Sequence, residues 1–324
     1  MKKFLIAVCI GFSCSLFAAP YVTNVVAKQR YPWGIVDISC DVKGIEESRE
    51  IGFSIEAVLP DLGVKKASEV RFRGVENSTA DEMIATTNGN YRFVWNANAD
   101  IGSTHYTNIV VRIGIYKIPN KVQLWEDGPY WAEMNIGANE PWEAGYYFWW
   151  GDTVGYKREN DKWVASDGSN SNFSFGGSNT PTYGKSISLL KSEGWTTAEG
   201  VLAPEHDAAK KHWGGNWRMP THQEFADLNN KCDWSWTTMN GVAGYVVRGR
   251  GDYASKSIFL PCAGDGYGTS LEYAGSYGDY WSSVPGSDGN DDAWRLDFYS
   301  SSHGTNYDDR YYGQSVRPLQ GFTK

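Results

Sequence analysis

The sequence has few long apolar segments. Its one extended apolar run, FLIAVCIGFSCSLFA, begins at residue 4 and is too short to cross a bilayer as a helix. Lys2 and Lys3 precede this run and the small residues Ala18 and Ala19 follow it, which is typical of a secretory signal peptide. We therefore expect residues 1–18 to be a signal peptide. The mature chain is then exported, to the periplasm, the cell surface or the medium, and has no transmembrane segment.

Positive charge is also in short supply. The chain has 30 Lys and Arg residues against 38 Asp and Glu residues, and loss of Lys2 and Lys3 with the signal peptide leaves a net charge of −10. Affinity for nucleic acid depends on neutralising phosphate groups with basic side chains. We therefore expect no nucleic acid partner.

Cysteine is scarce after the signal peptide, where only Cys40, Cys232 and Cys262 remain. In an oxidising compartment Cys232 and Cys262 could form a disulfide bond, but the sequence does not show whether their geometry fits one. Three scattered cysteines do not have the spacing of a zinc site. The sequence indicates no cofactor and leaves the disulfide open.

The common catalytic signatures are missing, since the sequence contains no nucleophile elbow, phosphate loop or defined carboxylate pair. His206, His212 and His222 are six and ten residues apart, so they do not offer two metal ligands on successive helical turns. We expect these histidines to be solvated or hydrogen-bonded, and the protein to be non-enzymatic.

A calcium loop is only partly matched. Asp288, Asn290 and Asp292 alternate as at the start of such a loop, but Ala293 replaces the required glycine and Tyr299 replaces the closing glutamate. We therefore expect no bound metal.

Residues 20–118 indicate an all-β domain. Apolar and polar positions alternate in IVDISCDV, EIGFSIEAVL, YRFVWNA and NIVVRIGIY, and turn residues separate these segments. Strands without a long helix must cover one another, which predicts a β-sandwich. The runs VDISCDVKG and YRFVWNANAD resemble immunoglobulin-like domains that precede catalytic or lectin-like domains in some secreted bacterial proteins. That resemblance implies a spacer.

The composition changes after residues 119–123, which we expect to be a linker. From residue 124 to residue 324, Trp, Tyr and Gly crowd the chain, and two short helices are signalled. PEHDAAKKHW would have Pro204 at its first helical position. THQEFADLNNKC carries a capping box, with Thr221 and Glu224 three residues apart.

Several ordered motifs make this second segment resemble a known family. They are WAEMNIGANEPWEAGYYFWWGD, LAPEHDAAKKHWGGNWRMPTHQEF, CDWSWTTMNGVAGYVV, SIFLPCAG, YWSS and GQSVRPL. Together they resemble the Fibrobacter succinogenes major paralogous domain, over about residues 124–319. The resemblance implies a C-type-lectin-like fold, an α+β domain with a small sheet, two short helices and long loops. The family itself implies no settled activity.

One motif also allows an enzymatic alternative. NWRMPTHQEF is similar to the RLPTEAEWE segment of formylglycine-generating enzymes, which share this fold. Those enzymes need a pair of reactive cysteines late in the domain, and neither KCDW nor FLPCAG matches that motif. An oxidase of this type is therefore the third of our functional hypotheses.

The composition of residues 282–313 suggests a binding surface. Of these 32 residues, 22 are Gly, Ser, Asn, Asp or Tyr, a mixture that binding loops favour. The window contains no Lys, Glu, Met or Gln, and its only tryptophan is Trp294. Codons of the form AAC or AAT, randomised at their adenines, encode none of those five residue types. The window therefore resembles the variable region of proteins diversified by retroelements.

The alternation in AWRLDFY assigns the two faces of a strand. We expect an inward face of Trp294, Leu296 and Phe298, and an outward face of Arg295, Asp297 and Tyr299. The candidate ligand contacts are eleven residues that we expect to share one exposed face: Asp288, Asn290, Asp292, Asp297, Tyr299, Ser301, His303, Asn306, Tyr307, Asp309 and Tyr311.

Two interpretations of this window remain beside diversified recognition of a protein or glycan ligand. The protein could be a glycan-binding adhesive surface protein without diversification, because aromatic rings and acidic loops suit sugars. The window could also be an ordinary polar loop system.

Overall fold

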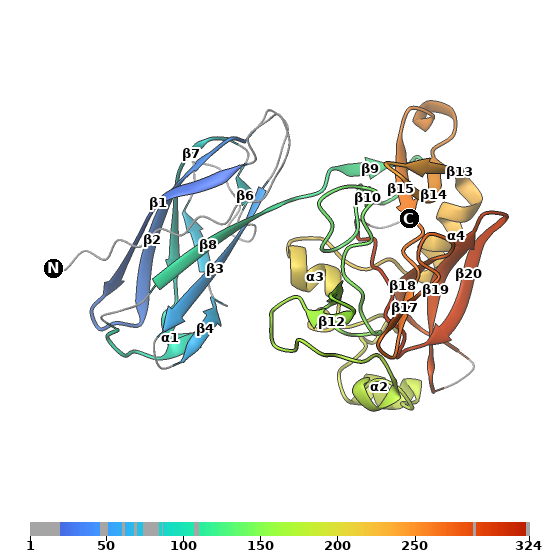
Figure 1. The fold of residues 1–324 in the computed structure, drawn as a ribbon. Coiled ribbons are helices and arrows are strands. Elements are labelled where there is room, and N and C mark those ends of the chain that lie inside the picture. Colours follow the sequence, from blue (N-terminus) through green and yellow to red (C-terminus); the bar gives the residue numbers. More distant parts are fainter. Residues whose placement is uncertain are drawn as a thin grey trace. The chain divides into compact units, whose positions relative to one another are not determined.

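Two units make up the computed structural model, residues 1–118 and residues 119–324. The structure describes residues 20–45, 51–59, 62–67, 70–73, 84–85, 87–106, 110–287 and 290–321. The expected signal peptide, residues 1–18, lies outside these ranges. Both units are rich in β-strands and carry only short helices (Figure 1). Within the described ranges, no helix has the length and apolar character needed to cross a membrane.

The described part of the first unit consists of two antiparallel sheets over one core. The four segments predicted as strands form β2, β3, β7 and β8, and the buried positions of β2 alternate as expected. Inward side chains such as Ile38, Phe53, Phe93 and Ile113 come from both sheets and share one hydrophobic cluster. The elements are β1 (Tyr21–Arg30), β2 (Ile35–Lys43), β7 (Gly89–Trp95) and β5 (Val70–Arg73) in one sheet, β4 (Gly63–Lys66), β3 (Ile51–Leu59), β6 (Ile84–Ala85) and β8 (Val110–Lys117) in the other, and α1 (Ala97–Ile101).

In its described residues, the second unit consists of small sheets and three short α-helices joined by long loops (Figure 1). The expected linker, residues 119–123, belongs to this unit and includes a strand that pairs with β10. The strands are β9 (Lys121–Gln123), β10 (Tyr130–Ala132), β11 (Tyr156–Glu159), β12 (Lys162–Ala165), β13 (Asp233–Met239), β14 (Val242–Arg248), β15 (Ser257–Pro261), β16 (Asp265–Tyr267), β17 (Ser270–Glu272), β18 (Gly278–Pro285), β19 (Asp292–Tyr299), β20 (Ser302–Asp309) and β21 (Leu319–Gln320). The helices are α2 (Ile187–Ser192), α3 (Ala208–Trp213) and α4 (His222–Lys231).

The two predicted helices correspond to α3 and α4, whereas α2 was not predicted. The capping box of α4 is confirmed, because Thr221 accepts from the Glu224 N–H and the Glu224 carboxylate accepts from the Thr221 N–H. The prediction for Pro204 is wrong: α3 begins at Ala208, and the Asp207 side chain caps it by accepting from the Lys210 N–H at 3.0 Å. A carboxylate cap satisfies a free backbone donor, which a proline ring cannot do.

The β18–β19–β20 sheet lies between two clusters of core side chains. Leu296 and Phe298 of β19 pack with Phe225 and Leu228 of α4. Ala293 of the same strand packs in a different cluster, with the side chains of α2 and α3. Because successive side chains of a strand point to opposite faces, each face of this sheet has its own core support. The sheet is therefore a rigid base for the residues predicted to bind ligand.

Candidate functional site

The pairing of β19 with β20 divides the predicted contacts between two faces. Trp294 pairs with Tyr307, and Phe298 pairs with His303, so these residues lie on the face covered by α4, which we call the α4 face. Asp297 pairs with Gly304 and lies on the opposite face. Side chains paired across two strands point to the same face. The expectation that all eleven contacts share one face is therefore wrong, because the set includes both odd-numbered and even-numbered positions of each strand.

On the α4 face, the predicted contacts pack against aromatic side chains. The His303 ring stacks on Trp234 with ring centroids 4.4 Å apart, and it hydrogen-bonds Asn229 of α4. The Tyr307 ring lies 4.0 Å from Trp294, which in turn stacks on His222. Trp294, expected in the core, is instead half-buried between these two rings. Much of the surface of His303 and Tyr307 is therefore used in packing on the sheet and is not available to a ligand.

On the opposite face, tyrosines and carboxylates stand in rows across the sheet. Tyr277, next to the start of β18, contacts Tyr299 of β19 with ring centroids 5.3 Å apart. In the next row Asp279 pairs with Asp297, and in the row after it Arg295 pairs with Asn306. We call this surface the tyrosine face.

The tyrosine face is rimmed by two groups of tyrosine rings. The first contains Tyr273, Tyr277 and Tyr299, which are 61%, 40% and 39% exposed. The second contains Tyr183, Tyr267, Tyr311 and Tyr312, whose ring centroids lie 4.9 to 6.0 Å from one another in contacting pairs.

Between the two groups, one guanidinium is surrounded by carboxylates. Arg295 Nη1 donates to Asp279 Oδ1 at 2.6 Å and to Asp308 Oδ2 at 2.8 Å, and Nη2 lies 3.9 Å from Asp297 Oδ2. Asp265 is also within electrostatic reach of this group. We call these five residues the Arg295 cluster. The Arg295 side chain, expected to point to solvent, is only 18% exposed, because the carboxylates on neighbouring strands hold it.

The carboxylates of this cluster repel one another. Burial, with repulsion by Asp279 and Asp308, raises the pKa of Asp265 to about 7. Burial also raises the pKa of Asp279 and of Asp308 to about 6, although Arg295 opposes both shifts. Carboxylates with shifted pKa values are common at functional sites.

A buried arginine fixes the loop ends beside the second tyrosine group. Arg310 is fully buried and donates to the carbonyl oxygens of Thr182, Lys185 and Asn290 at 2.8 to 2.9 Å. These bonds join Arg310, the residue before Tyr311, to the segments that carry Tyr183 and Asn290. Burial is the main cause that raises the pKa of Tyr311, and its side-chain hydrogen bond with Asp309 is the second.

The remaining predicted contacts lie at the margins of the sheet. Asn290 is exposed in the loop before β19, and Ser301 is exposed in the turn before β20. Asp292 is partly buried beside Asp309, which repels it and adds to the effect of burial in raising its pKa. Asp288 lies outside the described residues.

Sequence reasoning missed the part of the tyrosine face that lies before residue 282, and two residues of the face inside the window 282–313. The missed residues are Tyr183, Tyr267, Tyr273, Tyr277, Tyr312, Asp265, Asp279 and Asp308. Most of them come from the segment GDGYGTSLEYAGSYGDY, residues 264–280, which has the same Gly, Tyr, Ser and Asp composition as the window. That composition was the available signal. The proximity of the two segments was not, because it depends on the pairing of β18 with β19.

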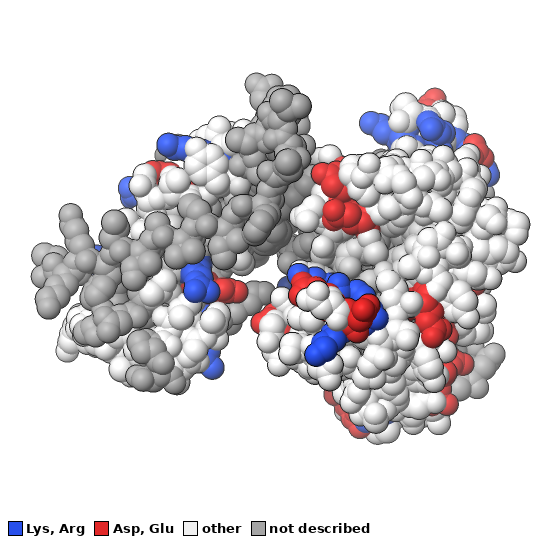
Figure 2. All heavy atoms as spheres, in the orientation of Figure 1, with Lys and Arg blue, Asp and Glu red and all other residues white. Residues whose placement is uncertain are grey.

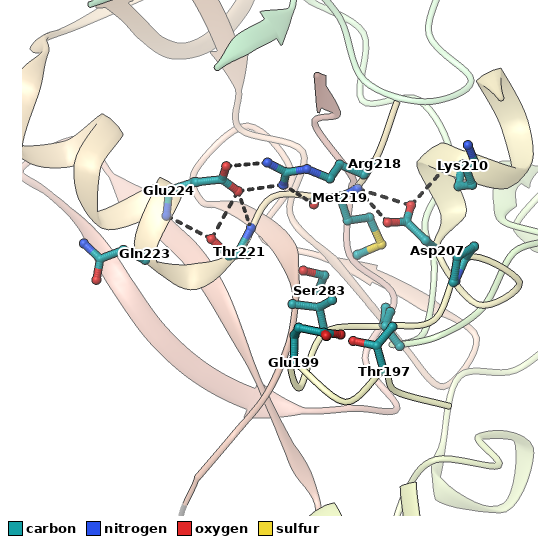
Figure 3. Close-up of a pocket in the computed structure, with 13 residues that line it drawn as sticks. Thr197, Glu199, Asp207, Lys210, Arg218, Met219, Thr221, Gln223, Glu224 and Ser283 are labelled. Carbon is teal, nitrogen blue, oxygen red and sulfur yellow. Dashed lines mark hydrogen bonds and ion pairs between the residues drawn. The ribbon is translucent and has the colours of Figure 1, made fainter. Parts of the chain in front are cut away.

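A separate cavity of about 550 Å³ lies near the first turn of α4 (Figure 3). Its charged side chains are held by structural contacts. Glu224 caps α4 and accepts from Arg218 at 2.5 and 2.8 Å, while Asp207 caps α3 and accepts from the Met219 N–H at 2.9 Å. The other lining residues include the apolar side chains of Val201, Leu202 and Pro204. This cavity has the size of a small-molecule site, but two of its acidic side chains, Asp207 and Glu224, are committed to the helix ends.

The disulfide that the sequence left open is not formed, since Cys232 and Cys262 are buried free thiols. They lie at opposite ends of β14: Asp233, next to Cys232, pairs with Arg248, whereas the Cys262 N–H donates to the Ala243 carbonyl. Five residues of strand separate those ends by about 17 Å. A disulfide needs Cα atoms within about 7 Å.

The surface charge and the comparisons with known proteins add little to this geometry. On the face in view in Figure 2, the described Lys and Arg residues form small groups rather than a continuous basic track. Among the described residues, no three His, Cys, Asp or Glu side chains are grouped to hold a metal ion. The chain matches no protein-family model, no curated protein and no solved structure.

Proposed function

We propose that this protein is an exported ligand-recognition protein, non-enzymatic, whose second unit carries the binding surface. In this proposal the second unit is a C-type-lectin-like domain related to the Fibrobacter succinogenes major paralogous domain. The first unit is an immunoglobulin-like spacer. The observation that carries the proposal is the tyrosine face, where two groups of partly exposed tyrosine rings flank the Arg295 cluster on one side of a supported sheet.

The physical properties of this face suit recognition. Tyrosine contributes a large contact area at a small cost in side-chain entropy, and Ser, Gly and Asn adapt their hydrogen bonds to a ligand. The rings are held by one another and by the strands beneath them. Gly278 of β18 shows how closely these strands pack, because an added Cβ there would lie 2.0 Å from the Phe298 ring. A ligand therefore meets a surface that is already ordered, which lowers the entropic cost of binding.

The residues of the face within the window 282–313 are also candidates for diversification. Asp297, Tyr299 and Asn306 have side chains on the tyrosine face, and each can be encoded by a codon derived from AAC or AAT. Sequencing of the gene's neighbourhood tests this part. A reverse transcriptase gene with a template copy that differs from this gene only at adenines is the expected result. A locus without either removes diversification and leaves recognition in place.

Binding itself is tested with an array of glycans and surface peptides probed with the mature chain, residues 19–324. The test variant is Tyr299→Ala, and the control is Tyr130→Ala, because Tyr130 is 45% exposed on β10, outside the tyrosine face. Loss of one aromatic contact of the tyrosine face should weaken the tightest ligand by about tenfold. We expect that loss in Tyr299→Ala and not in Tyr130→Ala. Equal binding by both variants would contradict the proposal.

Glycan binding is the alternative within the same class, and a specific observation favours it. Tyr267 is 47% exposed and Tyr273 is 61% exposed, so their rings can stack on a sugar. Carboxylates nearby can accept hydrogen bonds from sugar hydroxyls. Array hits confined to glycans, and lost in Tyr299→Ala, would select this alternative over a protein ligand.

The oxidase hypothesis is disfavoured by the cysteines. A pair of thiols that act together must be adjacent, but Cys232 and Cys262 lie at opposite ends of β14. Burial also raises the pKa of both thiols to about 12, whereas reactive cysteines have lowered pKa values. Oxygen consumption with a cysteine-containing peptide is the measurement that would revive this hypothesis.

A further inference from the structure

The middle of the tyrosine face has an excess of negative charge, because its carboxylates outnumber its one guanidinium. Asp265, Asp279, Asp297 and Asp308 surround a single Arg295, so the Arg295 cluster has a net charge of −3 when all its groups are ionised. Two of these carboxylates reach the surface, since the side chains of Asp297 and Asp308 are 26% and 19% exposed. A positively charged group placed above them would relieve this repulsion.

The two tyrosine groups stand on either side of this negative centre. Tyr299 is two residues from Asp297 on the same face of β19. Tyr312 lies within electrostatic reach of Asp308 and Asp265, and its ring contacts Tyr267 at 5.4 Å and Tyr311 at 4.9 Å. The face of an aromatic ring attracts cations such as guanidinium and ammonium groups. Both the rim and the centre of this surface therefore favour positively charged ligands.

A buried amide provides an independent observation. Gln314 is fully buried, and its Nε2 donates to Asp308 Oδ2 at 2.7 Å, which places the amide at the Arg295 cluster. Its Oε1 has no hydrogen-bond partner among the described residues. Buried polar atoms normally have a partner. A ligand that orders a water beside this amide would supply the missing donor.

Resting on the recognition function proposed above, we propose that the tyrosine face binds a protein segment that presents a protruding Arg or Lys side chain. The basic group lies over Asp297 and Asp308, and the tyrosine rings on both sides contact its alkyl stem and the adjoining peptide. Arg295 does not make the surface attract anions, because three carboxylates already surround its guanidinium. Charge complementarity of this kind selects partners and excludes acidic ones.

Fluorescence polarisation with two labelled peptides tests this proposal. The first is a Gly/Ser peptide with three arginines, and the second has citrulline at the same positions, which keeps the shape and removes the charge. The arginine peptide should bind at least about tenfold more tightly, as expected for a charge-assisted contact. Equal binding of the two peptides would overturn the cationic ligand.

Matched variants separate a local site from the general attraction of an acidic protein. Asp297→Asn should weaken the arginine peptide by about threefold to tenfold, whereas Asp252→Asn, with the same charge change at an exposed position of the unit, should not. Tyr299→Ala should weaken it by about twofold to fivefold, and Tyr130→Ala should leave it unchanged. Equal losses in Asp297→Asn and Asp252→Asn would refute a site on the tyrosine face.

The array separates failure of this inference from failure of the recognition function. Array ligands that depend on Tyr299 but bind Asp297→Asn unchanged would show that the face recognises ligands without a cationic anchor. That outcome would overturn the inference alone. If no ligand of any charge depends on Tyr299, the inference and the recognition function both fail.

Discussion

Asp265→Asn isolates the most strongly perturbed carboxylate of the Arg295 cluster. Asp265 is 5% exposed at the start of β16, and its pKa is raised from its ordinary value of 3.8 to about 7 by burial and by Asp279 and Asp308. Asparagine has nearly the same shape but carries no charge. The substitution therefore removes the cost of burying the charge together with the repulsion, and it leaves the packing of the site largely unchanged.

The pKa of Asp265 sets both the sign and the size of the effect. Because the folded state holds this proton more tightly than the unfolded chain does, stability is lost as the pH rises from about 4 to about 7. The difference between a pKa of about 7 and 3.8 corresponds to a loss of about 4 kcal/mol. At pH 8, Asp265→Asn should therefore be more stable than the parent protein by up to about 4 kcal/mol. At pH 4 the two should be nearly equal.

Urea unfolding of the mature chain at pH 4 and pH 8 measures this difference, with intrinsic fluorescence as the signal. Asp252→Asn is the control, because it removes one negative charge at an exposed position of the same unit. The control should change stability little at either pH. If Asp265→Asn is no more stable than the control at pH 8, the penalty of burial and repulsion that we infer for the ionised Asp265 does not exist.

Three further predictions concern the scaffold. Thr221→Ala should lower the free energy of unfolding by about 1 to 2 kcal/mol because it removes the capping box, whereas Thr221→Ser should retain most of it in the same urea assay. Gly278→Ala should cost about 1 to 3 kcal/mol, because the added Cβ meets the buried ring of Phe298, whereas Gly304→Ala has open space and should be close to neutral. The three cysteines of the described chain should resist a thiol reagent at pH 8 until the protein is unfolded, because burial raises their pKa values to about 12; a missing pair of thiols after unfolding would show a disulfide.

Local patterns predicted much of the fold. The strands of the first unit and the capping box of α4 were predicted because each depends on residues adjacent in sequence. Pro204 was misread because Asp207, three residues later, supplies a better cap. The coarse β-rich character was therefore predictable, and the start of α3 was not.

The composition of the site was predictable, but its geometry was only partly so. The alternation of β19 correctly separates Phe298 from Asp297 and Tyr299. It does not show that α4 covers the face of His303 and Tyr307, because that depends on contacts between distant segments. The alternation also does not predict that carboxylates on β16, β18 and β20 hold Arg295 away from solvent.

Hydroxyl-radical footprinting read by mass spectrometry tests most directly whether the tyrosine face binds a ligand. The mature chain is labelled with and without the tightest ligand of the array, and oxidation of each tyrosine is compared. We predict protection of Tyr273, Tyr277 and Tyr299, with Tyr130 unchanged. Protection of Tyr130, with the tyrosine face oxidised as in the free protein, would contradict the account.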